Sequence, residues 1–353
     1  LIITYVAIPK VIFFSEKLRL FDSAGKRASH EGSTPVFGGI AIFSGIIFSL
    51  LFWAEIENIQ FILVSFLIVF FVGVIDDLLT LSPIKKLIGQ IISILIIIYL
   101  GDLQIDNMRG VLGVHELPAW ISTLFTIFVV IVITNGFNLI DGVDGLAGGL
   151  GVIASLAFGI ITLLMEQGDM AIIAFSLTGA LVGFLKYNLH PARIFMGDTG
   201  SLVVGMTLSV LAINIIQNGL VTETLHFPNK GPLLAIVILA IPLFDSLRVF
   251  VVRVMKGRHP LYPGREHIHH ALLKLGIGHI STSLILCAFS IILILFSYFL
   301  PFSFFSLPFS FSLFLSFFLS SSSSSPPSPS PSLLLSFSSS PLPLPSLFSS
   351  LPS

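Results

Sequence analysis

The sequence predicts an all-α fold, namely a polytopic integral membrane bundle of about ten transmembrane helices. The chain of 353 residues is 55% hydrophobic and 10% charged, with a mean hydropathy of +1.03, and this composition excludes a water-soluble domain. Its apolar residues also form runs long enough to cross a bilayer core about 30 Å thick, which takes roughly 20 helical residues. The single cysteine, Cys287, excludes a disulfide framework and a cysteine-based metal site.

Each apolar run predicts one helix. The runs lie near residues 36–54, 59–75, 84–100, 118–134, 146–165, 170–187, 199–216, 231–252 and 281–300. Residues 1–14 are apolar apart from Lys10, are too short to span a bilayer and do not begin with Met. We therefore expect them to be the end of a truncated first helix.

The last part of the chain has a different composition. Only Phe, Ser, Leu and Pro occur in residues 301–353, and all four can be encoded by codons that begin with two pyrimidines. We interpret residues 1–300 as the transmembrane domain and residues 301–353 as a low-complexity tail. The tail is either a translated pyrimidine-rich repeat, and so not native protein, or a disordered segment. It is expected to alter the last transmembrane helix.

The basic residues predict which side of the membrane is cytoplasmic. If the helices alternate in direction, all of the 17 Lys and Arg residues except Arg109 and Lys230 fall on one side. Cytoplasmic loops collect Lys and Arg, so this side is cytoplasmic. Four polar clusters lie on the same side, and a single site can therefore collect them. A net charge of −1 excludes nucleic acid as a partner.

Two of the clusters are acidic. Asp76 and Asp77 end an apolar run, and adjacent carboxylates repel each other unless they share a cation or a proton. A solvated pair that merely ends a helix is the alternative. In the segment NGFNLIDGVDGLAGG, residues 135–149, Asn138, Asp141 and Asp144 recur every three residues and are expected to share one face. The glycines of this segment permit a ligand or a helix to approach the backbone closely.

The other two clusters lie further along the chain. Asp198 begins a long apolar run, where an N-cap is the simplest interpretation, although a helix N-terminus also favours phosphate. His267, His269 and His270 follow Arg265 and could bind a metal, shuttle protons or hold a diphosphate. Without thiolates, and with carboxylates nearby, hard-metal phosphate chemistry suits this set better than zinc.

Four motifs together carry a family resemblance. The Asp76–Asp77 pair, NGFNLIDGVDGLAGG, IFMGDTGSL and REHIHHALLKLG occur in the order and spacing of one enzyme family. They resemble the polyprenyl-phosphate N-acetylhexosamine-1-phosphate transferases, the WecA/TagO/MraY group of glycosyltransferase family 4. The stretch LRLFDSAGKRASHEGSTPVFGGIAIF also resembles that family's first cytoplasmic loop, and the likeness spans residues 16–290.

The resemblance implies a reaction that depends on Mg²⁺ or Mn²⁺. N-acetylhexosamine 1-phosphate would pass from a UDP-sugar to undecaprenyl phosphate, with release of UMP, at the cytoplasmic face of a bacterial inner (plasma) membrane. The product would initiate a cell-envelope polysaccharide such as lipopolysaccharide or teichoic acid. The motifs are most similar to the UDP-N-acetylglucosamine enzymes, and the phospho-N-acetylmuramoyl-pentapeptide transferases are the alternative within the family. The sugar, the downstream polymer and any homo-oligomer stay open.

The resemblance also implies roles for individual residues. Asp198 and Asp77 would bind the metal, and Asp76 and Asp77 would be catalytic by orienting or deprotonating the lipid phosphate. Lys86 and Gln90 match a KLxxQ pattern and would contact the lipid phosphate, although anchoring of a helix end explains them equally well. Asn188 and Phe195 would hold and stack the uracil. The substrate-binding set is Asn138, Asp141, Asp144, Asn188, Phe195, Arg265, His267, His269 and His270.

A multi-pass transporter is the alternative from another functional class, because ionisable residues within membrane segments are its usual signature. Here the carboxylates lie at helix ends on one side, and no inverted repeat relates the two halves, which argues against alternating access. A non-catalytic membrane scaffold is a third interpretation. It predicts that replacing Asp76, Asp77 or Asp198 with Asn is tolerated.

Overall fold

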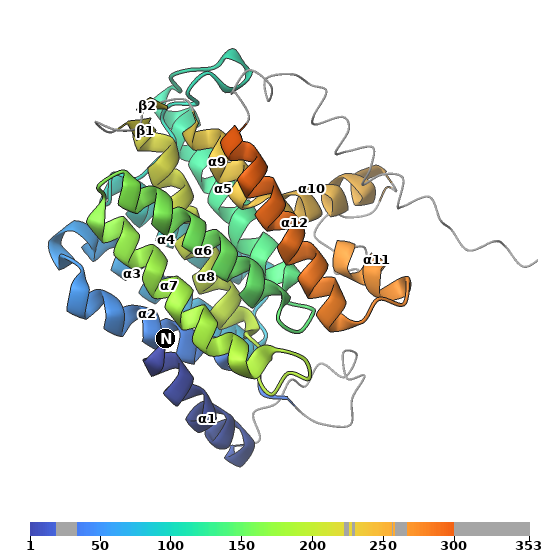
Figure 1. Cartoon of the computed structure of the whole chain (residues 1–353). Helices are drawn as coiled ribbons and strands as arrows, with labels where there is room; N and C mark the ends of the chain where they lie inside the picture. Colours follow the sequence, from blue (N-terminus) through green and yellow to red (C-terminus); the bar gives the residue numbers. More distant parts are fainter. Residues whose placement is uncertain (19–33, 222–225, 228–229, 256, 258–266, 300–353) are drawn as a thin grey trace, which may run out of the picture. The chain divides into compact units, whose positions relative to one another are not determined.

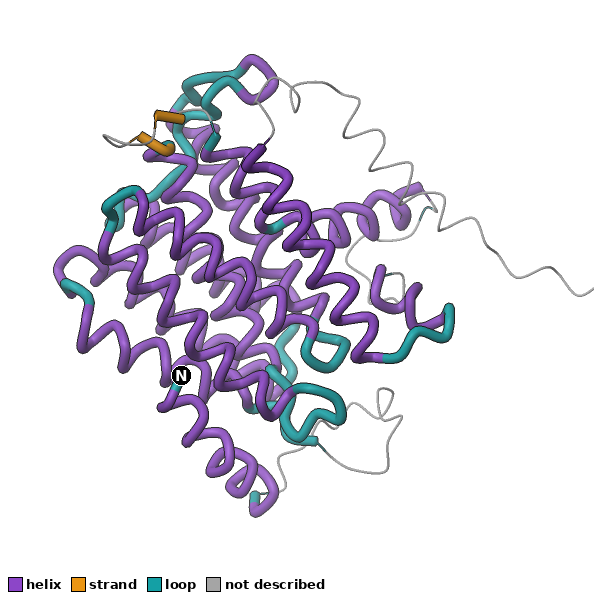
Figure 2. The backbone as a smooth tube through the Cα atoms, in the orientation of Figure 1, coloured by secondary structure: helices purple, strands orange, loops and turns teal. Residues whose placement is uncertain are grey.

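The computed structural model describes residues 1–18, 34–221, 226–227, 230–255, 257 and 267–299, and this part is almost entirely helical (Figure 1, Figure 2). The helices are α1 (Ile2–Lys17), α2 (Gly38–Trp53), α3 (Ile56–Leu79), α4 (Pro83–Tyr99), α5 (Ala119–Ile140), α6 (Leu146–Leu164), α7 (Gly168–Asn188), α8 (Gly197–Asn218), α9 (Gly231–Ile238), α10 (Ala240–Met255), α11 (Ile268–Lys274) and α12 (His279–Phe299). A 3₁₀ helix covers Val111–Gly113, and strands β1 (Leu220–Val221) and β2 (His226–Phe227) pair antiparallel. The all-α prediction is confirmed, with a small hairpin added.

The apolar runs of the sequence correspond to helices of unequal length. Among the described residues, six helices are long and apolar enough to cross a membrane, namely α3, α5, α6, α7, α8 and α12. The run at 231–252 contains both α9 and α10, which are bent by 75° at a break and together count as one further span. Helices α1, α2 and α4 have 16, 16 and 17 residues, so they fall just short of this length.

Large apolar side chains cover much of the outer surface of the helices. Phe52, Trp53 and Trp120, for example, are 77%, 76% and 68% exposed. Soluble proteins rarely expose apolar patches of this extent, whereas lipid tails solvate them. The protein is therefore a multi-pass membrane protein.

Helix α8 is the central helix of the bundle. Every residue from Thr199 to Ile216 is buried, and α2, α3, α5, α6, α7 and α9 all pack against it (Figure 1). Glycines allow the closest approaches: a Cβ on Gly73 would lie 2.4 Å from the Cα of Thr199, and a Cβ on Gly39 would lie 2.2 Å from the nitrogen of Gly200. The first turn of α8, which carries Asp198, is thus held tightly between α2 and α3.

Candidate active site

The end of helix α3 meets the start of helix α8 through the side chain of Asp77. Its Oδ1 accepts a hydrogen bond of 2.8 Å from the backbone N–H of Asp198. Its Oδ2 accepts bonds from the N–H (3.0 Å) and the hydroxyl (2.5 Å) of Thr199. The first N–H groups of a helix have no partner within that helix, and negative charge is stabilising there. Asp77 therefore caps α8 from a neighbouring helix.

Asp198 is not the cap that its position in the sequence suggested. Its Oδ1 accepts a hydrogen bond of 2.6 Å from Lys86 Nζ and another from Asn138 Nδ2. The Asn138 amide also donates to Ser201 Oγ at 2.9 Å, so it is oriented by the first turn of α8. Oδ2 of Asp198 accepts no hydrogen bond from the described residues, and the side chain is 33% exposed.

Lys86 connects two carboxylates at the start of helix α4. Its Nζ lies 2.9 Å from Asp76 Oδ2 and 2.6 Å from Asp198 Oδ1. Asp76 Oδ1 also accepts a 2.6 Å bond from the N–H of Leu81, just after Thr80, whose φ of 48° makes the turn between α3 and α4. Asp76 thereby stabilises the turn that brings Lys86 to this place. The buried charges are paired, as burial requires.

Asp76, Asp77, Asp198, Lys86 and Asn138 form what we call the carboxylate cluster. Its carboxylate and amide oxygens are the ligand type that Mg²⁺ prefers. Oδ2 of Asp198 is the oxygen best placed to bind a cation, whereas both oxygens of Asp77 already accept bonds from α8. The residues therefore fit a Mg²⁺ site on Asp198 better than one on Asp77. The ammonium group of Lys86 lies between the carboxylates of Asp76 and Asp198, which shows that these two side chains stabilise a positive charge there.

The segment after helix α5 does not place its polar residues on one face. Helix α5 ends at Ile140, and the chain then turns through residues 141–145. As a result, Asn138 bonds to Asp198, while Asp144 Oδ2 lies 2.6 Å from Nδ1 of His190. Asp141 lies half-buried at the end of the helix. The expected shared face fails because the helix ends between the first and second of these residues.

Asn188 connects two loops at this end of the bundle. Its Oδ1 accepts a 3.0 Å bond from the N–H of Gly145, and its Nδ2 donates a 2.9 Å bond to the carbonyl of Ile194. The side chain is only 3% exposed. Asn188 therefore holds these two loops together, and contact with a base would require its remaining hydrogen-bonding capacity.

Phe195 lies at the rim of the site and is 36% exposed. Its backbone N–H donates to the carbonyl of Pro35 at 2.8 Å, and its carbonyl accepts a 3.0 Å bond from the N–H of Gly38. The N–H of Gly39 continues this pattern with a 2.9 Å bond to the carbonyl of Met196. The start of helix α2 is thus paired with the IFMGD motif, and this pairing fixes the backbone of Phe195.

The histidines of the HIHH motif gather around Asp245 of helix α10. His267 Nδ1 lies 2.8 Å from Asp245 Oδ2, and Asp245 Oδ1 accepts a 2.9 Å bond from the N–H at residue 268. The rings of His267 and His269 are parallel, with centroids 5.5 Å apart, and those of His269 and His270 are 4.4 Å apart. Asp245, His267 and His269 are 1%, 4% and 2% exposed. We call Asp245, His267, His269 and His270 the imidazole cluster.

The imidazole cluster contacts the loop that follows helix α5. A Cβ on Gly142 would lie 3.1 Å from His269 Nε2, so the imidazole packs directly on the backbone there. The same loop carries Asp141 and Asp144. The motifs that the sequence placed on one side of the membrane therefore meet at one end of the helices.

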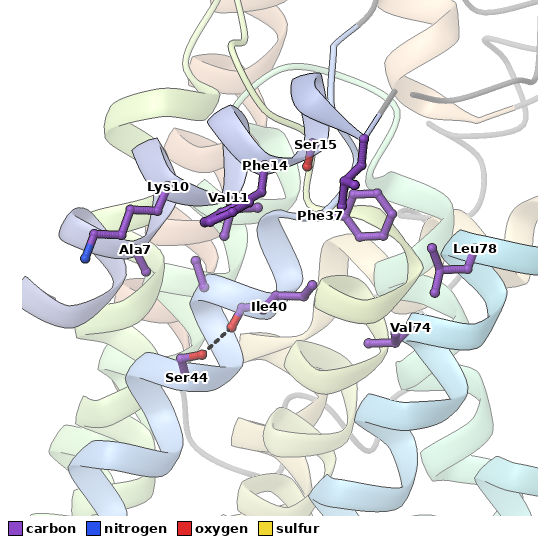
Figure 3. Close-up of a pocket in the computed structure, with 12 residues that line it drawn as sticks. Ala7, Lys10, Val11, Phe14, Ser15, Phe37, Ile40, Ser44, Val74 and Leu78 are labelled. Atoms are coloured by element: carbon purple, nitrogen blue, oxygen red, sulfur yellow. Dashed lines mark hydrogen bonds between the residues drawn. The ribbon is translucent and has the colours of Figure 1, made fainter. Parts of the chain in front are cut away.

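An apolar pocket of about 420 Å³ opens between helices α1, α2 and α3 (Figure 3). Val74 and Leu78 of α3 line it and lie on either side of the Asp76–Asp77 pair in the sequence. Phe14 of α1 and Phe37, just before α2, form other parts of the wall. The pocket thus places apolar surface next to the carboxylate cluster.

Comparison with known proteins identifies the family. Residues 59–216 match the model of a family described as glycosyl transferase family 4. The chain is also 31% identical over 291 residues to a probable undecaprenyl-phosphate N-acetylglucosaminyl 1-phosphate transferase of Bacillus subtilis (strain 168). The aligned residues make up 81% of this chain and 78% of the relative. The chain belongs to glycosyl transferase family 4. The resemblance inferred from the four motifs is confirmed.

Two further relatives have similar names. An undecaprenyl-phosphate alpha-N-acetylglucosaminyl 1-phosphate transferase of Salmonella typhi is 29% identical over 266 residues, which is 74% of this chain and 71% of the relative. A decaprenyl-phosphate N-acetylglucosaminephosphotransferase of Mycolicibacterium smegmatis is 35% identical over 189 residues, or 50% and 47% of the two chains. The region matched by the family-4 model contains the whole carboxylate cluster but ends before the imidazole cluster.

Of the remaining predicted residues, one lies away from both clusters and one has no described position. Gln90 is 1% exposed, and its Oε1 accepts a 3.3 Å bond from Asn135 Nδ2, so its amide faces the interior of the bundle. Arg265 lies outside the described residues. The roles assigned to the site residues stay predictions.

Three residues near the site were missed by motif analysis: His190, Asp245 and His279. Asp245 had a signal, because it is the one carboxylate in the apolar run at 231–252. His190 and His279 are isolated histidines near helix ends, where a motif search has nothing to find.

Proposed function

We propose that this protein transfers N-acetylglucosamine 1-phosphate from UDP-N-acetylglucosamine to undecaprenyl phosphate and releases UMP. The names of the Bacillus subtilis and Salmonella typhi relatives support this choice of donor and acceptor. The observation that carries the proposal is the carboxylate cluster, in which Lys86 and Asn138 hold Asp198 at the start of the buried central helix α8. A carboxylate held in this way can bind a divalent cation, which the transfer of a sugar phosphate between two anionic reactants requires.

In the proposed reaction, an oxygen of the lipid phosphate attacks the phosphorus that bears the sugar. A new P–O–P linkage forms as the bond from that phosphorus to the UMP oxygen breaks, and UMP leaves with the electron pair. Because both reactants are anionic, catalysis consists mainly of positioning and charge stabilisation. Lys86 contributes a fixed positive charge, and Oδ2 of Asp198 would hold Mg²⁺ or Mn²⁺, which supplies neutralisation of the diphosphate when bound.

The contacts of Asp76 and Asp77 favour positioning roles for both. Asp77 fixes the first turn of α8 and hence the backbone of Asp198, while Asp76 stabilises the turn that carries Lys86. Neither carboxylate needs to accept a proton from the lipid phosphate, whose oxygens are already anionic at neutral pH. We therefore favour orientation over deprotonation as their function.

The sugar nucleotide would bind between the carboxylate and imidazole clusters. Phe195 offers a partly exposed aromatic ring on which the uracil can stack. Asp141 and Asp144 lie on the loop that joins the two clusters, and the imidazoles can hold the diphosphate or the sugar. The contact between Gly142 and His269 supports one continuous donor site.

The apolar pocket supports a polyprenyl acceptor, because an isoprenoid chain needs apolar walls next to the reacting phosphate. Leu78 lines the pocket and is 49% exposed, so a larger side chain there can fill the pocket without disturbing the core. We expect Leu78→Trp to raise the KM for undecaprenyl phosphate severalfold and leave the KM for the UDP-sugar unchanged. Leu79→Trp is the matched control, since Leu79 is 72% exposed and does not line the pocket. Equal kinetics in the two variants would remove this support.

We place the site at the cytoplasmic face of the bacterial inner (plasma) membrane, where the lipid acceptor and the cytosolic nucleotide can meet. The distribution of Lys and Arg supports this orientation. Labelling of single cysteines introduced at Asp77 and His269 should modify both from the cytoplasmic side. Modification from opposite faces would rule the arrangement out.

The function is tested by UMP release in membranes that contain the full chain. Release should require UDP-N-acetylglucosamine, undecaprenyl phosphate and Mg²⁺ together, and chelation should abolish it. The lipid product should contain the sugar and both phosphates. Solute uptake into sealed vesicles without UMP release would instead support a transporter.

A further inference from the structure

A second group of potential metal ligands lies outside the carboxylate cluster. Asp144 is in the loop after helix α5, His190 follows helix α7, and His279 begins helix α12. One oxygen or nitrogen from each of the three lies within 4.8 Å of the other two, and all three side chains are half-buried. Three segments that are distant in the sequence therefore bring their ligand atoms to one point.

Other contacts hold these segments together in advance. The hydroxyl of Ser283, one turn into helix α12, donates a 2.9 Å bond to the carbonyl of Asp144. The N–H of Ala192 lies 3.3 Å from Asp144 Oδ2, which also lies 2.6 Å from His190 Nδ1. The rings of His190 and His279 stack with centroids 5.2 Å apart and planes 20° apart. These contacts hold the three side chains close together, and binding of a metal would require the two rings to turn so that their nitrogens point at it.

His279 carries an unsatisfied group at this place. Its Nδ1 is buried and has no hydrogen-bond partner among the described residues. A buried imidazole nitrogen without a partner is unfavourable, and such groups call for a specific explanation such as an ion. A cation held by His190, Asp144 and this nitrogen of His279 would give it a partner.

We propose that Asp144, His190 and His279 bind Zn²⁺ and thereby tie the start of helix α12 to the ends of α5 and α7. Two imidazole nitrogens and one carboxylate oxygen are a typical zinc ligand set, whereas Mg²⁺ takes oxygen ligands. Ligands about 2.0 to 2.1 Å from zinc lie roughly 3.4 Å apart in a tetrahedron, whereas Asp144 Oδ2 and His190 Nδ1 are 2.6 Å apart, so these two atoms must separate when zinc binds. The fourth position is left for water.

This site differs in kind from the carboxylate cluster. There the donors are oxygens and Lys86 already supplies positive charge, while here two nitrogens face a single carboxylate. The proposed reaction needs a hard cation at Asp198, whereas zinc at Asp144 would hold together the loops that border the proposed donor site. The inference therefore does not depend on the reaction proposed above, and its test does not use activity.

The test is zinc binding by the purified full chain in detergent after removal of metals with a chelator. We expect one tightly bound Zn²⁺ per chain by elemental analysis, a rise in the melting temperature on zinc addition, and no displacement by excess Mg²⁺. His279→Ala and His190→Ala should each weaken zinc binding at least about a hundredfold, because even the loss of an outer-shell partner costs 10- to 100-fold. The zinc-induced rise in melting temperature should be lost with it.

Two control variants separate this site from other histidines. His115→Ala changes an exposed histidine in the connection between α4 and α5, and His269→Ala changes the imidazole cluster. Both should keep full zinc binding. Failure of the wild type to bind zinc, or binding that His279→Ala retains and His269→Ala loses, would overturn the proposal.

A spectroscopic measurement covers the case in which the alanine variants fail to fold. Co²⁺ bound to the wild-type chain should give the intense visible absorption of a four-coordinate site with nitrogen ligands, and Zn²⁺ should abolish it. The weak absorption of Co²⁺ surrounded by six oxygens would contradict the proposed ligand set.

Discussion

The carboxylate cluster and the imidazole cluster lie at the same end of the bundle but are built differently. In the first, side chains from α3, α4 and α5 converge on the first turn of α8, a helix that is buried from Thr199 to Ile216. In the second, the histidines sit at the start of α11, a helix of seven residues, and are held by one carboxylate from the broken pair α9 and α10.

Exposure also separates the two clusters. Asp198 is one-third exposed and keeps an oxygen without a hydrogen-bond partner among the described residues, whereas His267, His269 and Asp245 are almost fully buried. The carboxylate cluster therefore has the geometry of a site that presents charge to a ligand. The imidazole cluster instead has the geometry of a structural support for the site, and its arrangement depends on Asp245. We expect substitutions in the first to cost more activity than substitutions in the second.

The largest effect is expected for Asp198→Asn. Asparagine can keep one hydrogen bond in place but loses the negative charge that faces Lys86 and would bind Mg²⁺. We expect kcat to fall roughly a thousandfold, the range seen when a preorganised electrostatic group is removed. UMP release from purified protein measures this, together with loss of any Mg²⁺-induced rise in melting temperature. Asp106→Asn, at an exposed position between α4 and α5, is the control.

A smaller but still large effect is expected for Lys86→Gln. The change removes the ammonium that lies between Asp76 and Asp198, so activity should fall roughly a hundredfold, or about 2.7 kcal/mol in kcat/KM. Because two carboxylates then lack a counter-charge, added Mg²⁺ should raise the melting temperature more than in the wild type. Lys85→Gln changes the exposed neighbour and should have little effect. Full activity of Lys86→Gln at saturating Mg²⁺ would mean that Lys86 serves only as a substitute cation.

The same comparison explains what the sequence could and could not predict about the site. Asp76, Asp77 and Asp198 were found because each lies at the end of an apolar run, where a charge stands out. Their mutual contacts could not be found, since Asp77 bonds to residues 121 and 122 positions away in the chain. Capping of α8 from another helix leaves no local pattern near Asp198, which is why Asp198 itself looked like the cap.

The helices were predictable for a similar reason, and their irregularities were not. A bilayer imposes a length, so apolar runs identify spans, but the break between α9 and α10 falls inside one continuous apolar run, from residue 231 to Phe244. Pro242, the third residue of α10, was the available signal, because proline is compatible with the first turn of a helix and not with its interior. Asp245 follows one turn later, so missing the break also meant missing the partner of His267.

Asp245→Asn tests whether the imidazole cluster depends on that one carboxylate. The amide can still accept the bond from the N–H at residue 268, but it loses the charge that faces His267. We expect about a tenfold loss in kcat/KM, with about 1 to 3 kcal/mol lost from the free energy of unfolding. If Asp245 acts through His267, adding His267→Gln should cost little more activity. Additive losses in the double variant would show that the two residues act separately.

The smallest effect is expected at Gly142, where the imidazole cluster packs against the loop after helix α5. A Cβ there would lie 3.1 Å from His269 Nε2, so Gly142→Ala should push the imidazole by a few tenths of an ångström without straining the backbone. We expect about a fivefold loss in kcat/KM for the sugar nucleotide, or about 1 kcal/mol, with the KM for undecaprenyl phosphate unchanged. Gly168→Ala is the control, because nothing lies within 4 Å of a Cβ at that position. If Gly142→Ala instead weakened the kinetics for both substrates equally, the imidazole cluster would contribute to the catalytic geometry that both substrates share. The proposed difference in role between the carboxylate cluster and the imidazole cluster would then not hold.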